Sequence, residues 1–388
     1  LLPYFTTELY KGSQGTAKAI KMRDITVDAL MELAIEETEF TTFKREFVIP
    51  EGTEYLSTPI DVENLRNYMN TLTWKIQHTG NQEEKNKFIR EKLKGQAILT
   101  NLNSNKELDQ EVIIADSGRI YLKGINLLNS PKNLRHAALG TCHLYDMRAG
   151  AFGILAALAQ TYAKAQGIGA PFSHIKGYIK YKEQYRMKIT KYVYPVQCQQ
   201  FKDISDYKKF YGYYNIKVAL TSIGFGAKRN HRAVWRDANN HWKRTSILDA
   251  FKGNQAELSR FLDCKIVQEL TDEYAEASKI VQYMIETEEK FSNRFNFTNA
   301  DKPAEKIALV YQHIEQEILM QFINNSNVQV LLPAHDGVYI KHAIDYTNVW
   351  STLEHDYIDD MSFIQFDHTK YISDKKKDKI LSILGKAF

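Results

Sequence analysis

The segment 328–342, VQVLLPAHDGVYIKH, places an Asp-Gly pair between two apolar runs. Asp-Gly flanked by hydrophobic residues is a strong local signal for a β-hairpin. The sequence therefore predicts two strands that meet at His335-Asp336. A carboxylate at such a tip can bind a metal ion, yet the same turn is common and often inert. Asp336 taken alone leaves both interpretations open.

The composition is that of a folded globular chain. It has 388 residues, of which 44% are hydrophobic, enough to bury a large core in two or three subdomains. The three cysteines, Cys142, Cys198 and Cys264, lie far apart and predict neither a disulfide framework nor a zinc site. No apolar run approaches the roughly 20 residues needed to cross a bilayer, and the first residues do not resemble a signal peptide. We therefore expect a cytoplasmic protein with no membrane partner.

The spacing of apolar residues predicts helices through most of residues 25–110. Apolar positions recur three and four apart in Asp28–Glu39 and in Val62–Ile76. The charged stretch at 83–94 is interpreted as the solvated face of a helix. Residues 111–124 instead predict a strand, a turn and a second strand, with Gly118-Arg119 in the turn.

Asp146 stands at a predicted junction between a strand and a helix. The strand-like His-Leu-Tyr precedes it, and a small, apolar helix follows over residues 149–165. An acidic residue at such a junction can hold a cation beside the sheet. It can equally cap the helix by accepting hydrogen bonds from the first free N–H groups. The residues alone leave both roles open.

Basic and aromatic residues alternate over 176–194. Basic side chains follow phosphates and aromatic faces stack on bases, so the pattern suits a nucleic-acid channel. The alternative interpretation is a half-buried pair of strands with a solvated lysine face. A second basic cluster occupies 228–236, and the segment before it would place Lys217, Thr221 and Phe225 on one face of a helix.

Three motifs in order resemble the single-subunit, bacteriophage-type RNA polymerases, the family that includes the mitochondrial enzyme. The first palm motif of that family is an Asp followed by a short polar stretch and a helix, as at Asp146. Its fingers motif is a Lys followed eight residues later by an aromatic-Gly pair, as at Lys217 and Phe225-Gly226. Its third motif is a His-Asp hairpin, as at His335-Asp336.

A looser fourth motif lies upstream of the other three. The segment 116–121, DSGRIY, resembles the family's Asp-x-Arg-Gly-Arg-x-Tyr turn and contains Arg119. It is one Arg short of that pattern. The resemblance as a whole runs from about residue 112 to the C-terminus.

The resemblance implies nucleotidyl transfer with two Mg²⁺ ions, held by Asp146, Asp336 and the backbone carbonyl of Met147. Lys217 would face the triphosphate and stabilise its developing charge, and Phe225-Gly226 would pack against the incoming base pair. The implied partners are a DNA template, nascent RNA and NTPs.

Sugar choice follows from side-chain volume. DNA polymerases with this palm place a Glu five residues after the first catalytic Asp, where this chain has Ala151. The small side chain leaves room for ribose and favours RNA synthesis. The family's RNA polymerases usually carry a Tyr where this chain has Phe225. His313 resembles the family histidine that contacts the 2′-hydroxyl, although a core or surface histidine is the alternative.

The chain is short for this family, which usually carries a large N-terminal domain. It begins without Met, so we expect its natural start to be missing or removed. We expect either a minimal polymerase acting on opened DNA or the larger, palm-and-fingers subunit of a heterodimeric phage middle-gene RNA polymerase, located in the bacterial host cytoplasm. A second polypeptide would then supply the missing part. The C-terminal 385–388 resembles the family's aromatic tail, with a frayed end as the alternative.

The expected architecture is a helix-rich α+β right hand. A helical, thumb-like region is expected at 1–110, the first part of the palm at 111–165, helical fingers at 166–300, and the rest of the palm with its small antiparallel sheet and the tail at 301–388. The alternatives are a family A-like DNA polymerase and a non-catalytic nucleic-acid-binding polymerase subunit.

Overall fold

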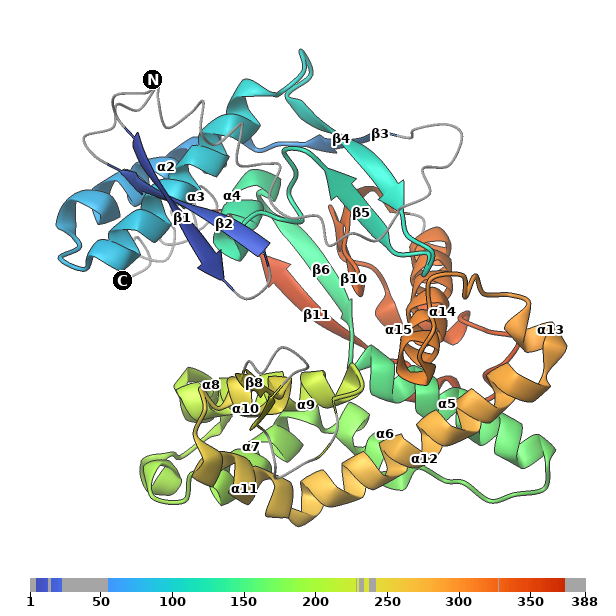
Figure 1. The fold of residues 1–388 in the computed structure, drawn as a ribbon. Coiled ribbons are helices and arrows are strands. Elements are labelled where there is room, and N and C mark those ends of the chain that lie inside the picture. The colour runs from blue at the N-terminus through green and yellow to red at the C-terminus, as the bar shows by residue number, and fades with distance from the viewer. Residues whose placement is uncertain are drawn as a thin grey trace, which may run out of the picture.

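The computed structural model describes residues 5–12, 15–22, 55–227, 229, 234–236, 242–326 and 328–373. These residues form a helix-rich α+β fold with small antiparallel sheets (Figure 1), which confirms the predicted fold class. The strands are β1 (Phe5–Gly12), β2 (Gly15–Met22), β3 (Tyr55–Pro59), β4 (Glu107–Ile114), β5 (Ile120–Lys123), β6 (Cys142–Met147), β7 (Val234–Arg236), β8 (Trp242–Arg244), β9 (Val330–Pro333), β10 (Gly337–Ile340) and β11 (Phe366–Tyr371).

Helices account for most of the rest. They are α2 (Val62–His78), α3 (Gln82–Thr100), α4 (Lys132–Leu139), α5 (Gly150–Ala165), α6 (Ser173–Lys180), α7 (Lys182–Val193), α8 (Ile204–Lys209), α9 (Tyr211–Gly224), α10 (Ser246–Ala250), α11 (Gln255–Asp263), α12 (Lys265–Thr287), α13 (Glu289–Ser292), α14 (Pro303–Ser326) and α15 (Tyr346–Ser351), with 3₁₀ turns η3 (Gln197–Gln200) and η4 (Met361–Phe363). The helices predicted over 62–76 and 149–165 are confirmed by α2 and α5.

The central sheet joins segments that are far apart in the sequence. Its strand order is β11-β6-β10-β9, and all neighbours are antiparallel. The strands β9 and β10 form the predicted hairpin, with residues 334–336 between them. The strand β6 lies between β10 and β11, so the first half of the chain contributes a middle strand to a sheet built from the second half.

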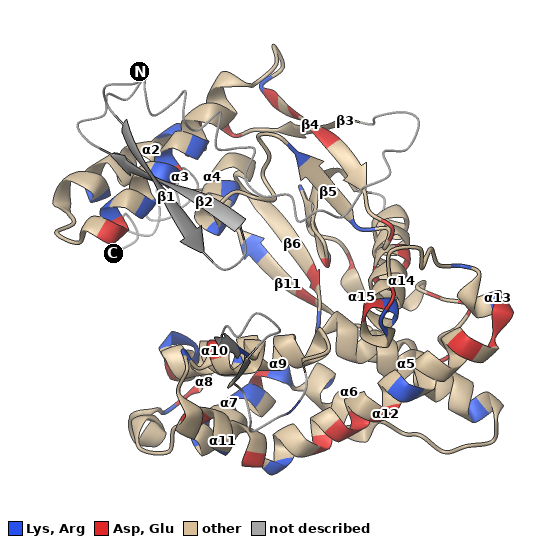
Figure 2. Cartoon of the chain, viewed as in Figure 1, with Lys and Arg blue, Asp and Glu red and all other residues tan. Residues whose placement is uncertain are grey.

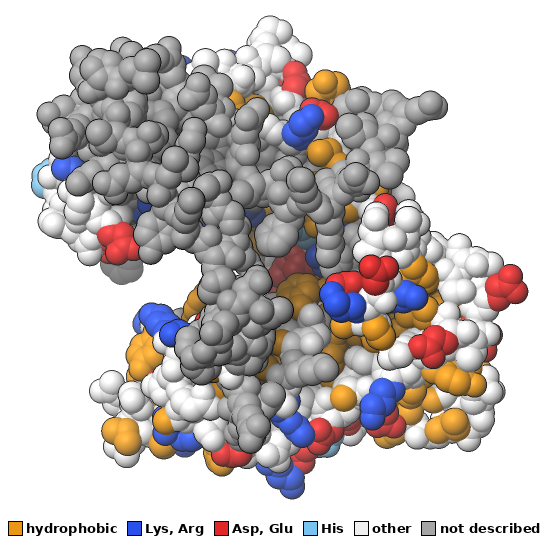
Figure 3. All heavy atoms as spheres, viewed as in Figure 1, with side chains coloured by type: hydrophobic (Ala, Val, Ile, Leu, Met, Phe, Trp, Pro, Cys, Tyr) orange, Lys and Arg blue, Asp and Glu red, His pale blue; other side chains and the backbone are white. Residues whose placement is uncertain are grey.

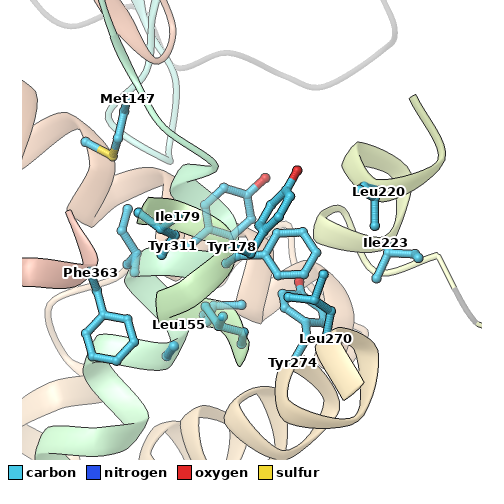
Figure 4. Packing of buried hydrophobic residues seen from close by; sticks show 14 of the residues in the cluster. Met147, Leu155, Tyr178, Ile179, Leu220, Ile223, Leu270, Tyr274, Tyr311 and Phe363 are labelled. Atoms are coloured by element: carbon cyan, nitrogen blue, oxygen red, sulfur yellow. The ribbon is translucent and has the colours of Figure 1, made fainter. Parts of the chain in front are cut away.

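Two hydrophobic cores cover the two faces of this sheet. On one face Tyr145, Val338 and Phe366 belong to the larger core, which extends through the helices α5 to α14 (Figure 4). On the other face Cys142 and Tyr339 belong to a smaller core, formed with α2, α3, α4 and β4. Successive residues of a strand point to opposite faces of the sheet. Apolar side chains of β6 and β10 therefore contribute to both cores.

The N-terminal helices and the later helical group lie on opposite sides of the central sheet (Figure 1). The sheet β3-β4-β5 stands beside the first group, and β4 with β5 confirms the strand, turn and strand predicted for 111–124. In the space-filling view a recess lies between the two groups, with acidic side chains at its bottom (Figure 3). The predicted domain boundaries stay predictions.

The strand-pair interpretation of residues 176–194 is wrong, because this stretch forms the helices α6 and α7. The buried apolar residues of α6 and α7 follow helical spacing; they are Ile175, Tyr178, Ile179, Ile189 and Val193. The predicted helix at 28–39, most of the basic cluster at 228–236 and the aromatic tail at 385–388 lie outside the described residues. Across the part of the chain that is described, no helix is both long enough and apolar enough to span a bilayer.

Candidate active site

Asp146 and Asp336 lie side by side at one end of the central sheet. The antiparallel register places Gly337 directly opposite Asp146, so Asp336 lies at the end of the same strand pair. The backbone N–H of Met147 donates to the carbonyl oxygen of Asp336 at 2.6 Å, which fixes the turn against β6. Acidic positions meet at this end of the sheet (Figure 2). The fold thus brings together the two aspartates that the sequence singled out.

The carboxylate of Asp336 disfavours the charge on Asp146. Asp146 is partly buried and Asp336 is exposed at the hairpin tip. Burial and the neighbouring carboxylate of Asp336 hold the pKa of Asp146 well above its usual range. A divalent cation would relieve this repulsion, and oxygen ligands suit Mg²⁺. The donor set therefore fits the predicted metal chemistry.

Protein ligands for such a cation are few. Among the described residues, no group of three or more His, Cys, Asp or Glu side chains is arranged to hold a metal ion. A metal site here would rest on Asp146, Asp336 and backbone oxygens such as that of Met147. Sites of this composition suit Mg²⁺, which retains water and shares ligands with substrate phosphates.

A third carboxylate, Asp367, lies next to this pair and was missed by the sequence reasoning. It is the register partner of Asp146 on β11. Arg148 bonds it at 2.8 Å through Nε, and Lys182 forms a short ion pair with its other oxygen. Although burial acts in the opposite direction, these two cations hold the pKa of Asp367 below its usual range. Arg148 and Lys182 thus form ion pairs with Asp367, whereas neither Asp146 nor Asp336 forms an ion pair among the described residues.

Arg148 also ties the later helices to the sheet. Its Nη1 donates to the carbonyl oxygen of Ile179 at 3.1 Å and to that of Lys180 at 3.3 Å, at the C-terminal end of α6. Lys182, at the start of the next helix, reaches the same Asp367. Two cations therefore join α6 and α7 to the strand beside Asp146.

The chain turns sharply after Asp146. The backbone N–H of Arg148 donates to the carbonyl oxygen of Gln365 at 2.7 Å, and Ala149 adopts a left-handed φ of 53° before α5 begins at Gly150. Left-handed alanine is strained, and such strain often accompanies functional sites. The N-cap position belongs to Ala149, and no side chain caps α5. The N-cap interpretation of Asp146 is therefore wrong.

Arg119 reaches the site from the β4–β5 turn and meets Glu315, a second residue that the sequence reasoning missed. Both Nε and Nη2 of Arg119 donate to Glu315 Oε2, at 3.2 and 2.5 Å. The guanidinium also lies 5.9 Å from the ring centroid of Tyr311. Burial and the nearby Asp336 raise the pKa of Glu315 to about 7, although Arg119 acts against the shift.

His313 lies one turn before Gln316 on α14, beside the same β4–β5 turn. A Cβ built on Gly118 would lie 3.5 Å from His313 Nδ1. Buried polar atoms without a hydrogen-bond partner in the described structure gather here, namely His313 Nδ1, Gln316 Oε1 and His335 Nδ1. The amide of Gln316 also donates to the carbonyl oxygen of His335 at 2.5 Å. His313 Nε2 lies 3.5 Å from Glu317 Oε1, while its unpartnered Nδ1 lies beside the β4–β5 turn, where it is available to a ligand or to water.

The helix α9 presents Lys217 and Phe225 on an exposed surface. Lys217 is exposed, and Phe225, which follows the last residue of α9, is 56% exposed. The ring centroid of Phe225 lies 6.2 Å from that of Tyr311. Gly226 follows with a positive φ of 86° and ends the helix.

The end of α9 packs against the start of α5. A Cβ built on Gly224 would lie 3.5 Å from the Cβ of Ala151, and the hydroxyl of Tyr274 donates to the carbonyl oxygen of Gly224 at 2.8 Å. Ala151 and Phe225 therefore lie close to each other, near Asp146. Within the described residues, no contact joins Lys217 to the aspartates. Lys217 lies about two helical turns before Phe225 along α9.

No protein-family model matches the chain, and no curated protein matches it. Among solved structures, it is similar to the POL domain of Pol1 from M. smegmatis in complex with DNA primer-template and dNTP. The TM-score is 0.48 at 10% sequence identity, over 82% of this chain and 67% of that chain.

Proposed function

We propose that this chain catalyses template-directed RNA synthesis from NTPs, as a DNA-dependent RNA polymerase or its catalytic subunit. The observation that carries the proposal is the pairing of Asp146 with Asp336 at the end of the central sheet, just before α5, on whose start the Phe225 end of α9 packs. A DNA template, nascent RNA, NTPs and a second polypeptide supplying further N-terminal structure belong to the same proposal.

The residues divide the work by chemistry. Asp146, Asp336 and the Met147 carbonyl would hold two Mg²⁺ ions, which when bound activate the attacking 3′-hydroxyl and neutralise the leaving pyrophosphate. Lys217 provides an ammonium for the triphosphate, and Phe225-Gly226 provides a face for the base. Arg119, held by Glu315 and Tyr311, adds a fixed guanidinium at the β4–β5 turn. The left-handed turn at Ala149 sets the direction in which α5 leaves Asp146.

The RNA assignment depends on space near the sugar. Ala151 offers a small side chain next to Gly224, and Gly150 precedes it without any Cβ. His313 adds a polar group near the hairpin. Phe225 contributes stacking only, since it carries no hydroxyl.

The direct test is extension of a labelled RNA primer on single-stranded DNA. We expect incorporation with NTPs and Mg²⁺, loss of incorporation when EDTA removes the metal, and recovery when Mg²⁺ returns. Incorporation of dNTPs as readily as NTPs would support the DNA polymerase alternative. Tight template binding without incorporation, even after addition of candidate partner proteins, would support a non-catalytic subunit.

Lys217→Met should reduce kcat/KM for NTPs by about 10²-fold while template affinity changes little. The reason is that removal of one fixed donor to developing charge costs about 10²–10³-fold in rate. Single-turnover extension and fluorescence anisotropy measure the two effects separately. Lys209→Met, an exposed lysine at the end of α8, is the matched control and should leave kcat/KM within about twofold. Equal losses in both variants would remove Lys217 from the proposed site.

A further inference from the structure

Glu315 is a buried carboxylate with one oxygen committed and one free. Its side chain is only 3% exposed. Arg119 directs both of its hydrogen bonds to Oε2. Within the described residues no hydrogen bond reaches Oε1. Oε1 is not among the buried, unpartnered side-chain atoms of the described residues, so it keeps some exposure and is accessible to a small donor.

The free oxygen faces the start of α5. A Cβ built on Gly150 would lie 2.6 Å from Glu315 Oε1, closer than real atoms approach. Only glycine at position 150 therefore lets the carboxylate reach this place. Ala151, the next residue, is also small and touches the end of α9. The oxygen thus lies at the edge of a space kept open by two small residues.

The surroundings of this space match the parts of a nucleotide. Phe225 stands on one side as an exposed aromatic face, linked to Arg119 through the ring of Tyr311. The carboxylate of Asp336 is near enough to contribute to the raised pKa of Glu315. A base stacked on Phe225 and an α-phosphate beside the aspartates would leave the sugar between them, next to Glu315 and Ala151.

Two other roles for Glu315 are less consistent with the structure. As a metal ligand it would form a group of three carboxylates with Asp146 and Asp336, and no such group exists among the described residues. As a charge at the N-terminus of α5 it would be favoured by the helix dipole. That role, however, does not explain why Oε1 of this carboxylate has no hydrogen-bond partner among the described residues.

We propose that Glu315 is the specificity-determining residue for the sugar, with Oε1 accepting a hydrogen bond from the 2′-hydroxyl of the incoming NTP. The inference rests on the proposed function. Gly150 and Ala151 leave room for the hydroxyl, and Arg119 holds the carboxylate in place. This acceptor supplies the contact that the hydroxyl-free Phe225 does not make.

The wild-type protein provides a first test without any substitution. Primer extension is compared with NTPs, dNTPs and 2′-deoxy-2′-fluoro-NTPs, because fluorine fills the 2′ position but donates no proton. We expect both analogues to fall about 10- to 100-fold below NTPs in kcat/KM, the usual range for a hydrogen bond to a charged group. Fluoro-NTPs used as well as NTPs would overturn the proposal, since size alone would then decide.

Glu315→Gln tests the residue itself. We expect kcat/KM for NTPs to fall about 10- to 100-fold and that for dNTPs to change less than about threefold. Equal losses for both sugars would show a purely structural role and overturn the inference. Glu91→Gln is the matched control, because Glu91 is a buried glutamate that accepts from Tyr68 Oη at 2.7 Å in the N-terminal helices. It should leave the NTP-to-dNTP ratio unchanged.

Gly150→Ala tests the position of the carboxylate without removing its charge. The new Cβ would displace Oε1, so the preference for NTPs should fall as in Glu315→Gln. An unchanged preference would contradict the proposed geometry even if Glu315→Gln failed to fold. Absence of all incorporation by the wild-type protein would instead count against the proposed function. Incorporation by the wild type, with a ratio unaffected by either variant, would overturn only the role of Glu315.

Discussion

Asp336→Asn is expected to reduce nucleotide incorporation by at least about 10²–10³-fold while the protein stays folded. Asparagine keeps the shape of the side chain at an exposed turn, so the hairpin and its bond to Met147 should survive. What is lost is one of the two charges that face each other at the end of β6. Rapid-quench primer extension measures the rate, and circular dichroism confirms the fold.

Two further measurements separate a metal-site defect from a binding defect. Calorimetric titration with Mg²⁺ or Mn²⁺ should show weaker metal binding in Asp336→Asn. Template affinity should stay the same or increase, because the substitution removes a negative charge near the phosphates. Asp359→Asn is the control, since Asp359 is an exposed carboxylate paired only with Lys164 in the described residues. Undiminished incorporation by Asp336→Asn would contradict the assignment of this carboxylate.

The local parts of the site could be predicted from the sequence. The Asp-Gly pair between apolar runs specified the β9–β10 hairpin, and the small apolar run after Asp146 specified α5. Lys217, Thr221 and Phe225 are all exposed, as expected for positions four apart along one side of a helix. Each of these predictions depends on short-range geometry, which a sequence pattern carries.

The parts that escaped prediction depend on long-range pairing. Asp367 matters because β11 pairs with β6, and no pattern near Asp367 announces that partner. In the sequence, Glu315 resembles any other charged residue on a helix. Its importance comes from the ion pair with Arg119, which forms only when α14 packs beside the β4–β5 turn. Lys182 belongs to the basic and aromatic stretch, and its ion pair with Asp367 arises only once α7 packs near the sheet.

The basic and aromatic stretch shows how a pattern can mislead. Alternating lysines and tyrosines suggested strands, but Tyr178 is buried with Ile175 and Ile179 on one side of α6. Other tyrosines in the stretch, Tyr181 and Tyr192, are 47% and 51% exposed. Burial of a helical face outweighs the weak alternation, because apolar contact with α5 and α12 stabilises it.

Gly337→Ala is expected to reduce incorporation by about 10²-fold or more, although the substitution adds a single methyl group and no charge. A Cβ at position 337 would lie 2.4 Å from the carbonyl oxygen of Tyr145 and 3.0 Å from the Cα of Asp146. Both neighbours are backbone atoms of β6, so a change of rotamer does not relieve the clash. The strands must separate where the two aspartates meet, and a displacement near 1 Å can cost about 10²-fold in rate.

The same clash should lower stability by about 1–3 kcal/mol, as overpacking does, so rate and stability must be measured apart. Thermal unfolding gives the stability, and extension rates at low temperature are divided by the folded fraction. Gly169→Ala is the matched control, because a Cβ at position 169 meets nothing within 4 Å and its φ is not positive. We expect that control to change stability by less than about 0.5 kcal/mol and to leave the rate unaltered. A normal rate per folded molecule in Gly337→Ala would show that the reaction tolerates movement of Asp336 relative to Asp146. A metal ion shared by the two carboxylates does not allow such movement, so this result would contradict the shared metal site.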